Sequence, residues 1–144
     1  MMQKINAFLS LSFSRKRLLI HTFGLSFYAY ILFTFFKKST QFGELVLSEE
    51  FPLKPNKKVD DIKWAIQVVA TKVPWKNVCR HQAYQAQWLC SLYKIPCRIF
   101  IGFRKSEKNE IQAHAWTIAA GKIITGFCNP EEYTVQRVYK NKWH

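Results

Sequence analysis

Acidic residues are scarce in this chain, and aspartates are almost absent. The sequence has 9 Asp and Glu against 22 Lys and Arg, for a formal net charge of +13, and its only aspartates are Asp60 and Asp61. Such a basic balance favours nucleic acid, anionic lipid or acidic polypeptides as partners. The basic residues are scattered, however, and no zinc-finger, recognition-helix or RNA-platform motif accompanies them. We therefore expect no nucleic-acid partner.

Cysteine pairs with metal-ligand spacing are also missing, although the chain has 4 cysteines. A zinc site built from Cys79, His81, His114 and Cys128 would have a spacing that matches no common pattern. We expect no metal and no cofactor. Because no persuasive secretion signal is present, we expect reduced thiols and a cytoplasmic location.

Long uncharged stretches are confined to the N-terminus. Leu18 to Phe36 carries no formal charge and lies between the basic runs 15–17 and 37–38. The stretch is long enough to span a bilayer, but it contains several polar residues, and basic flanks on both sides give no orientation signal. We expect one or two amphipathic or buried helices in segment 1–45, touching the membrane surface through their basic flanks, with a true single span as the alternative.

The rest of the chain predicts one domain with a real core. At 144 residues and 49% hydrophobic content, a single domain over 1–144 is the natural size, with its core in 56–144. Gln41 to Pro55 is typical of a connector. From Val59 to Lys72, apolar residues recur every three or four positions, which predicts a scaffold helix.

The stretch from Pro74 to Arg98 organises the chain. Asn77 is a good helix N-cap, which places Cys79 in the first turn of a helix that ends before Pro96. A thiol at a helix N-terminus meets oriented N–H groups and the positive end of the dipole, and both favour the nucleophilic thiolate. The alternative interpretation is a small buried cysteine. His81 projects from another side of this helix, and we expect it at the surface or in a substrate groove.

Beyond this helix, alternating apolar residues predict four strands, with a tight turn at Gly121 between the second and third. The predicted strands are Cys97–Phe103, Ile111–Ile118, Lys122–Phe127 and Tyr133–Tyr139. Helices followed by antiparallel strands predict an α+β fold with a helix docked on the sheet.

His114 lies on the second predicted strand and could serve as the base for Cys79, although a lone strand histidine can also be structural. If Ala120 and Gly121 form a two-residue turn, Thr125 lies diagonally from His114 on the same face and Asn129 one step the other way. Either could orient the ring as the third member of a triad. A one-residue shift of the turn would reverse these faces.

Several elements together resemble the lasso-peptide biosynthesis leader peptidases, the microcin-processing proteins with a transglutaminase-like, papain-like fold. The resemblance covers nearly the whole chain and matches the stand-alone form of the family. Its residues are Pro74-Trp75, Cys79, Ala83, Leu89, Leu92, Ile95-Pro96, Ile101-Gly102, His114-Ala115-Trp116, Gly121 and Thr125-Gly126.

The resemblance implies a cysteine protease that removes the leader from a ribosomally made precursor peptide. Cys79 would be the nucleophile and His114 the general base and acid, through a thioester. It also implies two partners, a separate leader-recognition protein and an ATP-dependent macrolactam synthetase.

One departure concerns the third catalytic residue. The family's aspartate is expected about 12 positions after the histidine, where this chain has Gly126. Thr125 and Asn129 are the candidate orienting residues, ahead of Glu131 and Glu132. A non-catalytic peptide-binding scaffold of the same fold is the alternative function.

Overall fold

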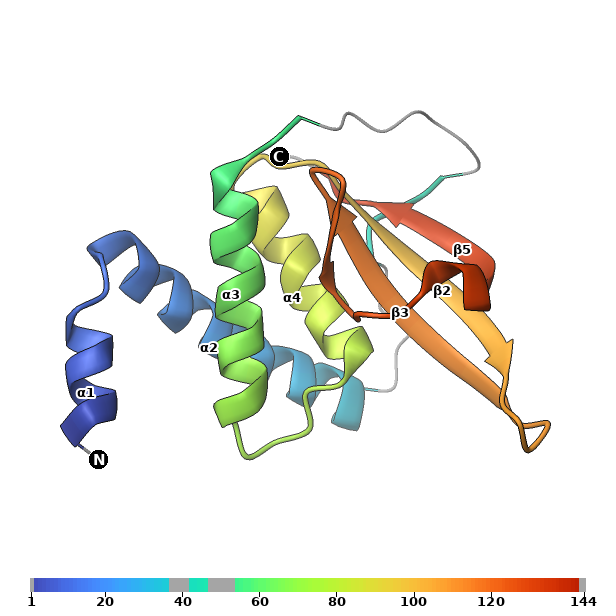
Figure 1. Cartoon of the computed structure of the whole chain (residues 1–144), viewed down its shortest axis with the longest axis horizontal. Coiled ribbons are helices and arrows are strands. Elements are labelled where there is room, and N and C mark those ends of the chain that lie inside the picture. The colour runs from blue at the N-terminus through green and yellow to red at the C-terminus, as the bar shows by residue number, and fades with distance from the viewer. Residues whose placement is uncertain (1, 37–41, 47–53, 143–144) are drawn as a thin grey trace.

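The α+β prediction is confirmed by the computed structural model, which describes residues 2–36, 42–46 and 54–142. Helices precede most of the strands along the chain and pack beside the sheet (Figure 1). The helices are α1 (Met2–Leu9), α2 (Phe13–Phe35), α3 (Lys57–Lys72) and α4 (Cys79–Leu92). The strands are β1 (Glu44–Leu45), β2 (Cys97–Lys105), β3 (Ile111–Ala119), β4 (Lys122–Thr125) and β5 (Thr134–Lys140), with a short 3-10 helix η1 (Pro130–Glu132) before β5.

The strands form one antiparallel sheet of 5 strands in the order β1-β5-β2-β3-β4. Strand β1 lies within the segment predicted as a connector, and the rest of that segment falls largely outside the described residues. The second basic flank of the N-terminal apolar stretch, 37–38, lies outside them too. The long β2–β3 hairpin forms the centre of the sheet and carries the predicted histidine.

Helix α3 forms where its apolar spacing predicts it. The side chain of Asn56 caps its start by accepting a hydrogen bond from the Lys58 N–H, and Val59, Ile62 and Ile66 are buried along one stripe. The main core joins this stripe to α2, α4 and β4. The helix is therefore scaffold, as predicted.

Helix α4 begins one residue later than an Asn77 cap would place it. Its N-cap is Val78, which makes no side-chain capping hydrogen bond. The side chain of Asn77 instead points along the helix, where its Oδ1 accepts from Gln85 Nε2 at 2.8 Å. The predicted cap is wrong because a buried amide partner outcompetes the helix N–H groups, but the position of Cys79 in the first turn is unchanged.

The two faces of the sheet have different roles. Side chains alternate along a strand, so Ala115 of β3 lies in a buried cluster with Ala83 of α4, whereas Trp116 lies on the opposite face. There Trp116 stacks on Phe100 at 5.5 Å and contacts Tyr133 at 5.6 Å. One face therefore holds the helices, and the other holds an aromatic cluster.

The β3–β4 turn forms at Ala120 and Gly121, which both have positive φ, as predicted. The register near the turn also follows the prediction, with Ile118 opposite Ile123. An irregularity then shifts the register, and Thr117 pairs with Thr125. The predicted uniform register is therefore wrong beyond Ile118, because one extra residue enters β4 as a bulge.

Candidate active site

Cys79 is the first residue of α4 and is half-buried at its N-terminus. It packs at the edge of the buried cluster that joins α4 to β2 and β3. The N–H groups of His81 and Gln82 bond to the Val78 carbonyl, and no side chain caps the helix. The first N–H groups of an α-helix have no partner within the helix, so the start of α4 can donate to an oxygen beside the thiol.

The other three cysteines are poorer nucleophiles for physical reasons. Cys90 and Cys97 are fully buried, and a hydrogen bond with Cys90, together with burial, raises the pKa of the Cys97 thiol well above its ordinary value. Burial, reinforced by the nearby Glu132 carboxylate, also raises the pKa of Cys128. Cys79 is therefore the free thiol with both access and a helix N-terminus.

His114 is half-buried on β3 and has a defined hydrogen-bond partner. Its Nε2 lies 3.0 Å from the carbonyl oxygen of Gly126, and its ring stacks on Tyr133 with centroids 5.3 Å apart. A carbonyl oxygen only accepts, so this bond requires the proton on Nε2. In the neutral ring, Nδ1 is then the acceptor that can take a proton from a thiol.

Gly126 occupies the position where the resemblance predicts an aspartate. Its φ is +64°, and a Cβ built on it would lie 2.0 Å from the Ala115 carbonyl oxygen and 2.9 Å from the Trp116 Cα. Any side chain here would collide with the backbone of β3. The close approach of Gly126 to β3 leaves no room for an aspartate side chain. The same approach places the Gly126 carbonyl within hydrogen-bond distance of His114.

Neither candidate orienting side chain is the hydrogen-bond partner of His114. Thr125 is buried on the other face, where its hydroxyl donates to Thr117 Oγ1 at 2.9 Å, as the shifted register requires. The side chain of Asn129 accepts from the Glu131 N–H at 3.3 Å and so caps η1. In this structure the hydrogen-bond partner of the His114 ring is instead a main-chain carbonyl, which carries no side-chain signature in the sequence.

The structure brings Cys79 and His114 to neighbouring parts of the fold without joining them. Ala115, next to His114 in the chain, lies in the cluster against which Cys79 packs, but alternation directs the His114 ring to the aromatic face. Among the residues described, the Cys79 sulfur has no hydrogen bond to His114. The thiol–imidazole contact that Cys79–His114 chemistry needs is therefore not formed among the residues described.

The sequence matches the family model of the transglutaminase-like superfamily over residues 34–138. The chain belongs to the transglutaminase-like superfamily. This superfamily includes cysteine proteases. Comparison with curated proteins and with solved structures found no match.

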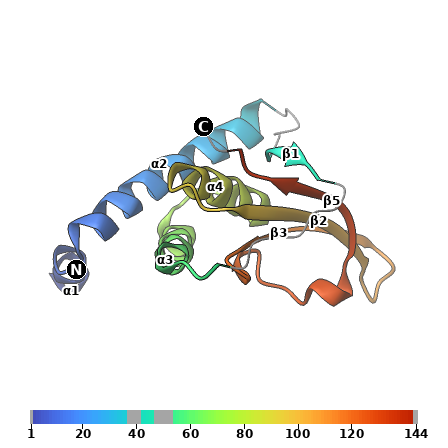
Figure 2. The same ribbon diagram turned by 90° about the horizontal axis from the view of Figure 1, so that it is seen from above.

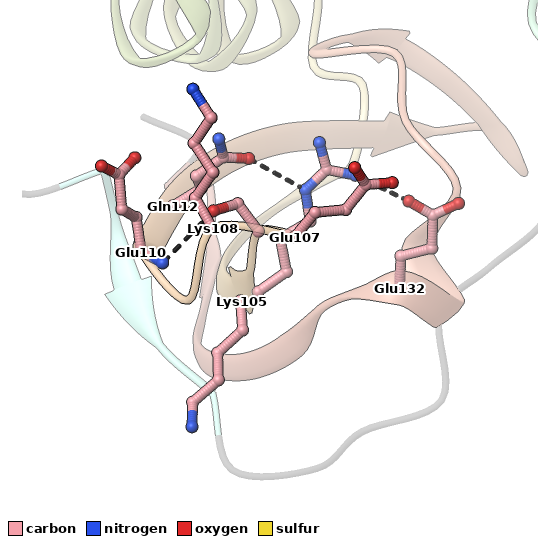
Figure 3. Close-up of a pocket in the computed structure, with 8 residues that line it drawn as sticks. Lys105, Glu107, Lys108, Glu110, Gln112 and Glu132 are labelled. Carbon is pink, nitrogen blue, oxygen red and sulfur yellow. Dashed lines mark hydrogen bonds and ion pairs between the residues drawn. The ribbon is translucent and has the colours of Figure 1, made fainter.

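Within this transglutaminase-like domain, an open cavity of about 700 Å³ lies at the end of the β2–β3 hairpin and is lined in part by Arg104 and Glu132. Figure 3 shows charged side chains of both signs around it, with the ammonium groups of Lys105 and Lys108 extending apart. Arg104 joins the cavity to the site: it bonds Glu132 at 2.7 Å and lies 5.1 Å over the Tyr133 ring. The remaining lining residues are Ser106, Glu107, Glu110 and Gln112.

His81 is buried, contrary to the prediction of a surface or groove position. It is 1% exposed and lies edge-on to Phe33 of α2 at 5.0 Å. Burial, with smaller effects of Arg80 and Lys76, lowers the pKa of His81 from 6.5 to about 4. A helical wheel cannot show this, because α2 covers a side of α4 that would otherwise face water.

Replacing His81 with leucine should reduce the fall in the free energy of unfolding between pH 6.5 and about pH 4. In the wild type, the unfolded chain takes up a proton below pH 6.5 while the folded ring stays neutral to about pH 4. The free energy of unfolding therefore falls as pH drops through that window, by roughly 3 kcal/mol. Urea denaturation at stepped pH measures this, with the exposed His21→Leu as the control. An equal fall in His81→Leu would refute the assignment.

Proposed function

We propose that this chain is a cysteine protease that removes the leader from a ribosomally synthesised lasso-peptide precursor. It works with a separate leader-recognition protein and an ATP-dependent macrolactam synthetase, which closes the ring on the freed amine. The superfamily match supports a cysteine-based acyl transfer, and the Cys79, His114-Ala115-Trp116 and Thr125-Gly126 elements support the finer assignment.

The proposed reaction uses Cys79 and His114 in two steps. Nδ1 of His114 takes the thiol proton, and the sulfur attacks the leader-side carbonyl while the N–H groups at the start of α4 hold the oxyanion. His114 then protonates the departing amine, which leaves a thioester on Cys79. Water, deprotonated by His114, attacks the thioester, and the leader leaves with a free carboxylate as the thiol is restored.

The observation that carries this proposal is the hydrogen bond between His114 Nε2 and Gly126 O at 3.0 Å. It fixes the tautomer that leaves Nδ1 as the base, which is one of the two tasks of a triad carboxylate. The other task is to stabilise the charged imidazolium. A carbonyl stabilises it less than a carboxylate would, because the carbonyl is neutral. We expect a slow enzyme whose rate depends on its partners.

A non-catalytic peptide-binding scaffold is the alternative, and two observations favour it. Among the residues that the structure describes, His114 has no carboxylate partner and no hydrogen bond to Cys79. In that case, the cavity at the β2–β3 hairpin would hold the peptide without cleaving it.

Mass spectrometry of a lasso-peptide precursor incubated with this chain and the recognition protein separates the two functions. Wild type should release an intact leader fragment, and Cys79→Ala should release none. The matched control is Cys128→Ala, which removes a half-buried thiol outside the proposed mechanism and should cleave normally. Precursor that stays bound to wild type but uncut would establish the scaffold instead.

A further inference from the structure

The long helix α2 fully buries one leucine and three small or polar residues, and it exposes several large apolar ones. Its buried positions, at helical spacing, are Leu18, Thr22, Ser26 and Ala29. Its exposed large apolar positions are Phe13, Ile20, Phe23, Phe27, Tyr28 and Phe35. A surface helix of a protein surrounded only by water has the opposite pattern.

The buried face is built for close packing. The hydroxyls of Thr22 and Ser26 donate to carbonyls of their own helix, at 2.8 Å each, so they leave no unpaired polar group in the core. Small residues then let α2 approach α3 and α4 closely. Interfaces of this composition are typical of helices whose other side faces lipid.

The exposed face is uncharged over most of its length. From Leu18 to Phe35 the helix contains no formal charge, yet Ile20 is 64% and Phe35 68% exposed. Figure 2 shows α2 along the edge of the molecule, with α3, α4 and the sheet on its inner side. An apolar strip of this kind marks an interaction surface.

Charge indicates which partner covers this face. The first turns of the helix carry Lys16 and Arg17 beside Arg15, which pairs with Asp61, and the chain has a net charge of +13. Basic residues beside an apolar helix face complement the anionic headgroups and the acyl boundary of a membrane. A protein partner whose matching face is apolar and uncharged would gain nothing from this excess of positive charge.

The packing of α2 favours a helix that lies in the interface rather than one that crosses it. Arg15 pairs with Asp61 of α3 at 2.9 Å, and Lys58 of α3 donates to Ser14 at 2.8 Å. Although α2 is long and apolar enough to cross a membrane, crossing would break these links and strip the buried face from α3 and α4.

We propose that α2 docks the folded domain on an anionic membrane surface through the face centred on Ile20, Phe27 and Phe35, with its inner face still packed on α3 and α4. The inner face of α2 packs in the cluster that Cys79 borders, but neither Cys79 nor His114 belongs to this outer surface. The proposal therefore stands whether or not the chain cleaves a precursor.

Flotation of the full chain with phosphatidylcholine vesicles containing about 30% phosphatidylglycerol tests it. Wild type should float with these vesicles, and Ile20→Glu/Phe35→Glu should lower the bound fraction at least about tenfold. The matched control is Leu92→Glu, which charges an apolar residue 59% exposed at the end of α4 and should float like wild type. Circular dichroism checks that each variant is folded.

Carbonate washing and light scattering distinguish surface docking from two alternatives, a membrane-spanning α2 and a dimer formed through this face. Release of the bound wild type by carbonate is expected for a helix lying in the interface. Retention against carbonate would show a span and overturn the proposal. A wild type that does not float, or a double variant that floats as wild type does, would also overturn the proposal. The same holds if the protein forms a dimer without lipid and Ile20→Glu/Phe35→Glu dissociates that dimer.

Discussion

Gly126→Ala is expected to lower the rate of precursor cleavage by at least about 10²-fold and the free energy of unfolding by about 2 to 4 kcal/mol. The added methyl would lie 2.0 Å from the Ala115 carbonyl oxygen at a φ of +64°. The β4–β5 connection must therefore move away from β3, and the carbonyl that orients His114 moves with it. Cleavage assays and urea denaturation measure the two effects.

Gly126→Asp sharpens this test because it supplies the carboxylate that the resemblance predicts. We expect no gain in rate, since the Cβ of any residue meets the same backbone atoms. The matched control is Gly24→Ala in α2, where an added Cβ would meet nothing within 4 Å. That variant should cleave normally and gain up to about 1 kcal/mol from helix propensity. A faster enzyme with Asp at this position would show that the Gly126 carbonyl is not the orienting group.

His114→Ala is expected to lower the cleavage rate by about 10² to 10⁴-fold, the usual contribution of a general acid and base. Without the imidazole, the reaction loses the group proposed to take the thiol proton and return it to the leaving amine. Single-turnover cleavage with the recognition protein present measures the chemical step itself.

The exposed His21 provides the control for that loss. His21→Ala removes an imidazole on α2, far along the chain from the site, and should leave the rate unchanged. Thermal denaturation of both variants separates lost chemistry from lost structure, because His114 also stacks on Tyr133. A His114→Ala enzyme with wild-type turnover would remove His114 from the mechanism.

The sequence predicts most of the fold because local patterns determine it. Helix α3 follows from apolar residues every three or four positions, strands β2 and β3 follow from alternation, and the turn at Ala120 and Gly121 follows from glycine. The bulge in β4 could not be predicted, because Lys122 to Thr125 contains no glycine or proline to mark an extra residue. That one-residue shift reversed the predicted face of Thr125.

Only part of the candidate site could be predicted from the sequence. Cys79 and His114 carry reactive side chains at recognisable positions, whereas the partner of His114 is a main-chain carbonyl that any residue possesses. The sequence does show a glycine at position 126, where an aspartate was expected. It does not show that Gly126 contacts the backbone of β3, and the role of its carbonyl depends on that contact. The burial of His81 depends on where α2 packs, which periodicity within α4 does not record.

The most direct test of the account is to trap the nucleophile with a leader peptide that ends in a chloromethyl ketone, followed by intact and peptide-level mass spectrometry. We expect one adduct per chain, on Cys79, formed at least about 10²-fold more slowly in His114→Ala and unchanged in Cys128→Ala. Labelling of Cys128 in preference to Cys79, or labelling of Cys79 at the same rate without His114, would contradict a Cys79–His114 peptidase.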